Sequence, residues 1–330
     1  MKAGGVALAL IALMVATPAT AQDVTVTATQ LPTFRGTPVG QQIQSLIYRG
    51  GLQLSSVDDR FGGLSGLGFL DVEGRMVAVS DRGQFLSGQL IHDEAGAPLS
   101  LVGVRMSAIQ NSRGADLPRA YARDAEGLAV VHRDGEPYAV RVSFENLTRV
   151  ADFQLENGVP GGPAREVSIP SWLSDTRTNE SLESVCIAPP ASPIAGSTLL
   201  ITEGVWAGDD GRAAWLLGNR DRGALTYRPG PGLSPTDCAF LPNGDLLVLE
   251  RGVSILAFGA RLARVPADEV YPGAEMQGHS LFQTVGGDLD NMEGVAVRHT
   301  PGGELRVVLL SDDNFNDWQR TVLLEFSIAE

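Results

Sequence analysis

The feature that most constrains the fold is a short pattern that recurs at intervals of 54 to 61 residues. In each copy a residue that is usually acidic leads into an apolar run of strand length. The copies are LSGLGFL (64–70), AEGLAVV (125–131), LESVCIA (182–188), TDCAFLP (236–242) and MEGVAVR (292–298). Such a period is typical of folds built from one repeated supersecondary unit. The chain is therefore expected to contain that unit five times.

Each unit carries a second apolar run that also ends in an acid. The first position is held by Ser65, Glu126, Glu183, Asp237 and Glu293, and the second runs end at Asp81, Glu145, Glu203, Glu250 and Asp312. The runs are short, rich in β-branched residues or leucine, and bounded by Gly, Pro, Asn or Asp, which is typical of strands. Turns such as RDGE and PNGD between the two runs predict hairpins.

These units predict an all-β chain that forms a single β-propeller, in which each unit is one blade. Five blades are favoured, and six are the alternative if the N-terminal stretch and a loop form an irregular blade. Only 37 residues follow Glu293, so the segment 45–56 is expected to supply a closing strand. Joining the two chain ends in one blade would remove exposed strand edges. A linear arrangement of two domains is the remaining alternative.

The first 21 residues are typical of a signal peptide. Lys2 precedes an apolar run from Val6 to Ala16, and Ala19-Thr20-Ala21 matches a cleavage site. A membrane anchor is the alternative, but this run is shorter than the roughly 20 residues that span a bilayer. We expect cleavage after Ala21, a periplasmic or secreted product, an extension at 22–41 and the propeller domain at 42–330.

Charge narrows the classes of partner. Lys2 is the only lysine, and 24 arginines face 39 acidic residues, so the net charge without Lys2 is −15. This balance argues against nucleic acid and anionic membranes and is compatible with binding cations. We expect a monomer that acts on a small or phosphorylated molecule. Cys186 and Cys238 lie in apolar runs, and the sequence leaves open whether they form a disulfide or stay free.

In a propeller, equivalent positions of the inner strands surround one channel, so the aligned acids are expected to form a carboxylate ring. The expected metal ligands are Asp81, Glu126, Glu183, Glu203, Asp237, Glu250, Glu293 and Asp312. Calcium suits such a ring because it accepts 6–8 oxygen ligands with tolerant geometry. The alternative is that strand ends are simply polar. The loop DDNFND (312–317) offers further oxygens, with a plain Asx-type turn as its alternative.

Two arginines adjoin the expected ligands. Arg82 follows Asp81, and Arg251 follows Glu250. An arginine beside a metal-binding acid can hold a phosphate or carboxylate with two hydrogen bonds. We therefore expect Arg82, Arg251, Glu126 and Glu293 to form the catalytic set. The alternative for each arginine is a local ion pair that neutralises part of the ring.

Several segments together resemble the phytase-like family of exported bacterial proteins, which carry the label "esterase-like activity of phytase". They are YRGGLQLS and RFGGLSGL (within 48–67), VSDRG (79–83), DAEGLAV (124–130), NESLESV (179–185), LLITEG (199–204), DNMEGVAV (290–297) and LLSDDNFN (309–316). The resemblance implies a β-propeller related to propeller phytases, which use calcium at the channel mouth to bind phosphate and activate water. This chain differs from those enzymes because, apart from Lys2 in the expected signal peptide, it has no lysine for a phosphate site.

The sequence thus predicts an exported, calcium-dependent hydrolase of phosphoesters or related esters. Two alternatives stay open. One is a non-catalytic propeller that holds a structural metal ion and binds a ligand or protein. The other is a hydrolase of sugar lactones of the gluconolactonase type, which uses one metal at the propeller axis.

Overall fold

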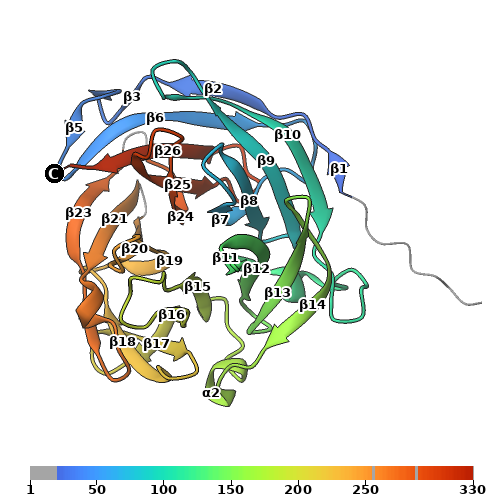
Figure 1. Cartoon of the computed structure of the whole chain (residues 1–330), viewed down its shortest axis with the longest axis vertical. Helices are drawn as coiled ribbons and strands as arrows, with labels where there is room; N and C mark the ends of the chain where they lie inside the picture. The colour runs from blue at the N-terminus through green and yellow to red at the C-terminus, as the bar shows by residue number, and fades with distance from the viewer. Residues whose placement is uncertain (1–20, 255–256, 287–288, 330) are drawn as a thin grey trace, which may run out of the picture.

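A computed structural model describes residues 21–254, 257–286 and 289–329. Within these residues five sheets stand around one central axis, like the blades of a fan (Figure 1). The expectation of an all-β, five-bladed propeller is confirmed, and the described residues form no sixth blade.

Every blade is a meander whose first strand lies nearest the axis. From the inside outward, blade 1 contains β7 (Leu64–Phe69), β8 (Arg75–Ser80), β9 (Gln84–His92), β10 (Pro98–Ala108) and β1 (Gln22–Asp23). Blade 2 contains β11 (Ala125–Arg133), β12 (Glu136–Phe144), β13 (Arg149–Glu156) and β14 (Val159–Val167). Blade 3 contains β15 (Leu182–Ile187), β16 (Thr198–Ala207), β17 (Gly211–Leu217), β18 (Gly223–Arg228) and β22 (Glu275–Gln277).

The last two blades follow the same plan. Blade 4 contains β19 (Ser234–Phe240), β20 (Leu246–Ser254), β21 (Ala257–Val265) and β23 (His279–Val285). Blade 5 contains β24 (Asn291–His299), β25 (Leu305–Asp312), β26 (Thr321–Ile328), β6 (Leu46–Ser55) and β2 (Thr27–Leu31). The remaining elements are β3 (Thr33–Phe34), β4 (Thr37–Pro38), β5 (Gln42–Ile43), α1 (Ala120–Arg123), α2 (Ser171–Ser174) and η1 (Ala267–Glu269).

The two chain ends meet in blade 5, as the sequence predicts. β6 from the N-terminal part pairs antiparallel with β26 from the C-terminal part, with Leu54 opposite Thr321 and Leu46 opposite Ile328. The segment 22–41, expected as an extension before the propeller, adds β2 to the edge of blade 5 and β1 to the edge of blade 1. The expected signal peptide lies almost wholly outside the described residues.

The hairpin turns have the backbone that their residues favour. Asp134 and Gly135 have φ of 54° and 89°, and Asn157 and Gly158 have φ of 53° and 81°. Positive φ at both central residues defines the type I′ turn, whose twist matches that of the flanking strands. The Asp-Gly and Asn-Gly pairs therefore set the hairpin register in blade 2.

The hydrophobic core is divided into five clusters, one between each pair of neighbouring blades. Leu52, Leu64 and Val308 belong to the cluster between blades 5 and 1, for example, and Phe85 and Phe153 to the cluster between blades 1 and 2. The inner faces of neighbouring sheets are thus mutually covered, which fixes the blades around the axis.

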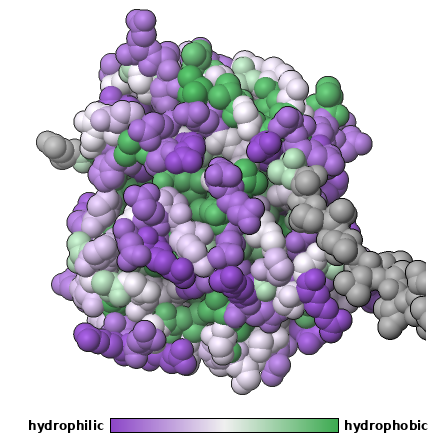
Figure 2. Space-filling model, turned by 45° about the vertical axis from the view of Figure 1, so that its right-hand side comes forward, coloured by the Kyte–Doolittle hydropathy of each residue, from purple (hydrophilic) through white to green (hydrophobic). Residues whose placement is uncertain are grey.

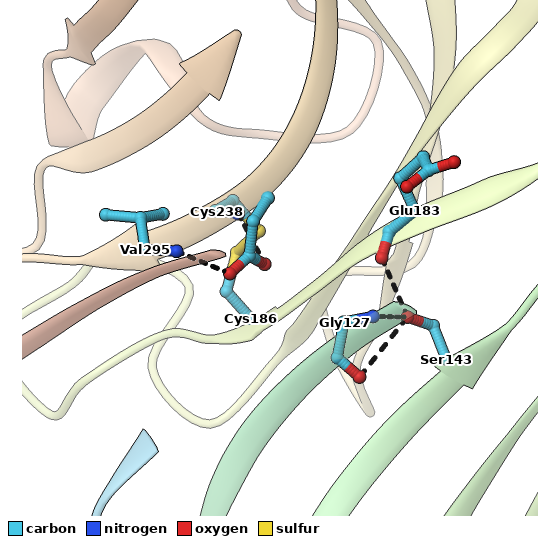
Figure 3. The surroundings of a disulfide bond; sticks show 7 residues. Gly127, Ser143, Glu183, Cys186, Cys238 and Val295 are labelled. Carbon is cyan, nitrogen blue, oxygen red and sulfur yellow. Dashed lines mark hydrogen bonds between the residues drawn. A yellow bond between two sulfur atoms is a disulfide. The ribbon is translucent and has the colours of Figure 1, made fainter. Parts of the chain in front are cut away.

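A disulfide resolves the cysteine question left open by the sequence. Cys186 on β15 and Cys238 on β19 are bonded, with Cα atoms 5.7 Å apart, and both are buried (Figure 3). The bond joins the inner strands of blades 3 and 4 directly.

Replacing both cysteines by serine is expected to lower the free energy of unfolding by about 2–4 kcal/mol, because the cross-link restricts the unfolded chain. Urea unfolding with and without a thiol reductant measures this. The reductant should shift the midpoint of the wild-type protein and leave the double variant unchanged. Equal midpoints for both proteins would contradict the assignment.

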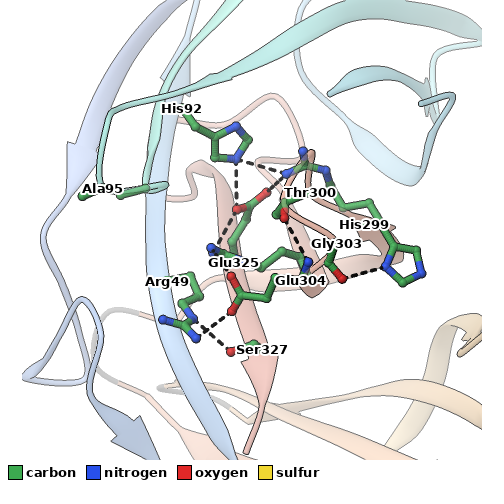
Figure 4. Close-up of polar contacts among 12 residues, drawn as sticks. Arg49, His92, Ala95, His299, Thr300, Gly303, Glu304, Glu325 and Ser327 are labelled. Atoms are coloured by element: carbon green, nitrogen blue, oxygen red, sulfur yellow. Dashed lines mark hydrogen bonds and ion pairs between the residues drawn. The ribbon is translucent and has the colours of Figure 1, made fainter. Parts of the chain in front are cut away.

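A buried ion network supports the closure between blades 5 and 1 (Figure 4). Glu325 of β26 is fully buried, and its carboxylate lies 2.9 Å from Nη1 of Arg298 and 3.0 Å from Nε2 of His92. Burial raises the pKa of Glu325, but the contacts with His92 and the charges of Arg298 and Arg306 outweigh it and lower the pKa overall. This carboxylate therefore stays charged inside the fold and is a structural group.

The face of the molecule drawn in Figure 2 is mostly polar. Figure 2 shows hydrophilic side chains over much of one face, with apolar residues in smaller patches between them. No helix among the described residues is long and apolar enough to cross a membrane.

Candidate functional site

All five inner strands bulge at the same place, near their first residues. In each blade the inner strand contains one more residue than the second strand just after one pair of facing residues. These pairs are Leu64–Ser80, Ala125–Phe144, Leu182–Thr202, Pro235–Glu250 and Met292–Ser311. Bulges of this kind re-aim side chains and are common at barrel rims and beside active sites. The bulge therefore provides a structural alignment of the five blades.

This alignment defines two rings of equivalent positions. The residues directly after the first member of each pair are Ser65, Glu126, Glu183, Thr236 and Glu293. The residues directly after the second member are Asp81, Glu145, Glu203, Arg251 and Asp312. In blades 1, 2, 3 and 5 the residues that the sequence aligned occupy these equivalent positions.

Blade 4 differs from the expected alignment by one residue. Thr236, rather than Asp237, is equivalent to Glu293, and Arg251, rather than Glu250, is equivalent to Asp312. Because side chains of a strand alternate between its two faces, a shift of one residue sends each of these acids to the other face. The expectation that Asp237 and Glu250 occupy the ring positions of blade 4 is therefore corrected.

Glu250 points into the space between blades 3 and 4. Its carboxylate is fully buried and accepts hydrogen bonds from the hydroxyl of Tyr227, from the amide of Gly230 at 2.9 Å and from Nη1 of Arg261 at 2.7 Å. These donors satisfy and neutralise the carboxylate locally. The structure does not bring Glu250 together with the other expected ligands.

Asp237 joins two inner strands. Its carboxylate accepts from the amides of Cys238 and Val295, each at 2.8 Å, and its exposed fraction is 1%. Burial raises the pKa of Asp237 well above its usual range, although both amide contacts act to lower it. This acid ties β19 to β24 through main-chain amides.

The remaining acids gather at one end of the channel, in a cluster that we call the acidic mouth. It consists of Asp81, Asp124, Glu126, Glu145, Glu183, Glu203, Glu293 and Asp312, linked by mutual contacts or electrostatic coupling. Glu145, Glu183, Glu293 and Asp312 are each no more than 8% exposed. Six of the eight expected metal ligands therefore lie in this mouth, and Asp124 and Glu145 join them.

Arg251 is a cation within the acidic mouth. Its Nη2 lies 2.9 Å from the carboxylate of Glu203, and its Nη1 contacts Glu293 and the side-chain oxygen of Asn291. The burial of Arg251 lowers its pKa, but the charges of Glu293 and Glu183 outweigh this and raise the pKa overall. These contacts favour the ion-pair alternative for Arg251, and among the described residues no arginine pairs with Asp124, Glu126 or Glu145.

The densest part of the mouth lies at blade 2. Asp124, Glu126 and Glu145 place one carboxylate oxygen each within 4.8 Å of the others. Oxygens that bind one calcium ion at 2.3–2.6 Å can be at most about 5 Å apart. The three oxygens therefore fit a shared divalent cation.

Burial and mutual repulsion hold protons in this cluster. Burial first, and then the charge of a neighbouring acid, raise the pKa of Asp81 to about 6 and of Asp312 to about 8. Burial likewise raises the pKa of Glu145 and of Glu293 to about 7, while Glu126 and Glu183 lie well above their usual range. The cluster therefore favours a bound cation over several bare negative charges.

The metal-free protein is expected to lose stability as the pH rises from 5.5 to 8. Acids whose pKa is raised by folding hold protons that the unfolded chain has already released, so each retained proton costs about 1.4 kcal/mol per pH unit. Melting temperatures after removal of metal with a chelating resin measure this, and saturating calcium should abolish the decline. A metal-free protein whose stability rises over the same range would contradict these assignments.

Arg82 lies at the rim of the mouth with an exposed side chain. Its guanidinium carbon is 3.2 Å from the centre of the Phe315 ring, and it forms no ion pair with any residue that the structure describes. Phe315 belongs to the loop 312–317, where the Asp312 carboxylate accepts the amide of Asn314 at 2.7 Å. The loop therefore contains the Asx-type turn that was its alternative, while Asp312 itself faces the mouth.

Further along the inner strands the channel becomes apolar. A cavity of about 160 Å³ is lined by residues of all five inner strands, including Leu67, Leu128, Val185, Cys238 and Val295. His132 is the one polar side chain among the residues that line this cavity, whereas the carboxylates gather in the acidic mouth.

Asp124 is the mouth residue that the sequence reasoning missed. It stands two positions before Glu126, as Asn291 stands two positions before Glu293, so the segments DAEG and NMEG carried the signal. Its pKa is raised by burial, and its carboxylate contacts both Glu126 and the side chain of Asn146. Glu145 was visible as the end of a strand and is equivalent to Asp81.

Comparison with known proteins agrees with this architecture. A family model described as Phytase-like, with esterase-like activity of phytase, matches residues 59–315. That range contains every residue of the acidic mouth and the inner strands of all five blades. No curated protein matches the chain. The match covers most of the sequence, and the chain therefore belongs to the Phytase-like family.

Proposed function

We propose that the protein is a calcium-dependent hydrolase that cleaves phosphoesters or related esters at the acidic mouth. The observation that supports this most is the meeting of Asp124, Glu126 and Glu145 within 4.8 Å, with no arginine paired to them in the part of the chain that the structure describes. All donors are carboxylates, the ligand type that calcium prefers over the nitrogen and sulfur ligands of zinc. Membership of the Phytase-like family supports a hydrolytic function.

The donor set divides into two groups. Asp124, Glu126, Glu145 and Glu183 are proposed as calcium ligands on blades 2 and 3, and Asp81, Asp312 and Glu293 as ligands on blades 1 and 5. Glu203 and Arg251 form an ion pair, so their part is to position Glu293. When bound, calcium polarises an ester or phosphoryl oxygen and lowers the pKa of a bound water.

The protein's own groups supply the remaining chemistry. Glu126 and Glu293 are proposed to accept the proton that the attacking water releases, since both are carboxylates within the mouth. Arg82 is proposed to bind the negative oxygens of the substrate, because its guanidinium is exposed and has no ion-pair partner among the described residues.

Replacing Glu126 by Gln is expected to lower calcium-dependent turnover of 4-nitrophenyl phosphate at least about 100-fold, the usual size of a general-base contribution. Turnover is followed as 4-nitrophenolate release in calcium and in EGTA, with 4-nitrophenyl acetate and a sugar lactone as further substrates. Glu136→Gln on the same blade, at an exposed position, is the matched control and should retain full activity.

Each alternative has its own result in this experiment. Calcium binding without turnover of any substrate would favour the non-catalytic propeller, and turnover of the lactone alone would favour the lactonase. Activity that is the same in EGTA and in calcium would contradict the proposal.

We also propose that the mature protein is exported and acts as a monomer. The signal-peptide pattern of residues 1–21 supports export, and so does the Cys186–Cys238 disulfide, since such bonds persist in oxidising compartments.

A further inference from the structure

A second polar site lies beside the acidic mouth, between blades 3 and 4. It is a pocket of about 630 Å³ lined by Trp206, Asp210, Arg212, Arg228, Gln277 and the loop 229–234. Pockets of roughly 300–1,000 Å³ are the size that small-molecule ligands occupy. We call it the Trp206–Arg212 pocket.

Arg212 provides an anion-binding group on the wall of this pocket. Its exposed fraction is only 9%, and its Nε donates to the main-chain oxygen of Glu203 at 2.5 Å. Its two terminal nitrogens have no hydrogen-bond partner among the described residues, and neither nitrogen is sealed from solvent. A guanidinium that is mostly desolvated and held in place binds an anion more strongly than a freely solvated one.

Arg212 is better placed to bind an anion than the other charged side chains that line the pocket. Arg228 is already paired with Glu275 at 2.9 Å, whereas Arg212 forms no ion pair with any described residue. Asp210 is exposed at the rim and adds a negative charge there. A ligand anion therefore has to reach Arg212 itself.

Trp206 gives the pocket a stacking surface. The indole ring covers the Arg212 guanidinium, whose carbon lies 3.9 Å from the ring centre, yet Trp206 is 62% exposed. An exposed tryptophan held against an arginine can stack a flat ring on its free face. The two side chains together match a ligand that carries both a ring and a negative group.

The pocket shares its walls with the acidic mouth. Arg212 bonds the main chain of Glu203, whose carboxylate belongs to the mouth, and Ser234 of the pocket pairs in the β19–β20 ladder with Arg251. We propose that the Trp206–Arg212 pocket binds the non-reacting part of the substrate, and that this part carries an aromatic ring and an anionic oxygen group. The proposal rests on the proposed hydrolytic function of the mouth and names its substrate class.

Binding to the pocket can be measured without hydrolysis. In EGTA the mouth lacks calcium and repels anions, so calorimetric titration with phenyl phosphate, inorganic phosphate and phenol reports on the pocket. Phenyl phosphate should bind more tightly than either fragment. Trp206→Ala should weaken this binding about tenfold, the scale of one aromatic contact, while Trp206→Phe should largely keep it.

Arg212→Gln should abolish binding of phenyl phosphate and of inorganic phosphate. Arg212→Lys keeps the positive charge but lacks the planar guanidinium that can donate two parallel hydrogen bonds to an anion. This variant should retain part of the affinity. Arg105→Gln removes an arginine from an exposed ion pair on blade 1 and is the matched control. Melting temperatures of all variants establish that they are folded.

Turnover then tests the link between the pocket and the mouth. In calcium, Trp206→Ala should raise KM for 4-carboxyphenyl phosphate, whose ring and carboxylate do not react, about tenfold and leave KM for glycerol phosphate unchanged, since the latter has no ring. Binding in EGTA that is unaffected by both Trp206→Ala and Arg212→Gln would overturn the proposal. If the protein hydrolyses nothing but these variants still lose binding, the proposed function fails while the pocket remains an anion site.

Discussion

Calcium is expected to raise the melting temperature of the metal-free protein by about 5–10 °C at a hundredfold excess over its Kd. An ion that binds only the folded state at this excess adds about 2.7 kcal/mol to the free energy of unfolding. The gain should increase with pH, because the acids of the mouth then release the protons that compete with the ion. Thermal melts at pH 7.5, recorded in EGTA and in millimolar calcium, measure the effect.

Two controls separate calcium binding from general screening of charge. Potassium chloride at matched ionic strength should shift the melting temperature much less, because it screens surface charges without occupying a site. Magnesium should also give a smaller shift, since it demands near-ideal octahedral geometry and dehydrates reluctantly. Melting curves that coincide in EGTA and calcium would count against a calcium site.

The replacement Glu250→Gln is expected to lower the free energy of unfolding by about 3–5 kcal/mol, in calcium and in EGTA alike. The carboxylate of Glu250 is the partner of the buried Arg261 and accepts from Gly230. Its amide would leave that arginine buried without a counter-charge. Urea unfolding of the variant in the two buffers measures the loss.

Glu183→Gln is the matched replacement inside the acidic mouth. It removes one of several repelling carboxylates, so the metal-free protein should become more stable while the gain from calcium decreases. Without metal, Glu250→Gln should therefore lower the free energy of unfolding, whereas Glu183→Gln should raise it. A Glu250→Gln variant that loses only the calcium-dependent stability would place Glu250 back among the ligands.

The blade count and the closure of the ring were predictable from the sequence because both depend on counting. The repeat fixes the number of inner strands, and only 37 residues follow Glu293, so the N-terminal segment had to complete the last blade. The pairing of β6 with β26 confirms this. The type I′ turn at Asp134-Gly135 was likewise visible as a local residue pair in RDGE.

The register of blade 4 was not predictable in the same way. Thr236 and Asp237 are adjacent polar residues, as are Glu250 and Arg251, so either member of each pair could occupy the ring position. Only the ladder shows that Asp237 lies opposite Leu249 and Glu250 opposite Pro235. Since a strand alternates faces at every residue, this single step decides whether an acid reaches the mouth or the space between blades.

The Trp206–Arg212 pocket also required the structure. Trp206 lies near the end of β16 and Arg212 near the start of β17, but most of the pocket comes from the loop 229–234, from β18 and from β22, which pairs parallel to β18. Such contacts depend on how the outer strands of blade 3 meet the loop that enters blade 4. No periodic pattern in the sequence encodes them.

Calorimetric titration of the metal-free protein with calcium tests the central claim most directly. The account predicts saturable binding that is strongly weakened in Glu126→Gln and in Glu293→Gln, and that is unchanged in Glu136→Gln. The absence of saturable calcium binding by the folded wild-type protein, or equal binding by all three variants, would contradict the acidic mouth as a calcium site.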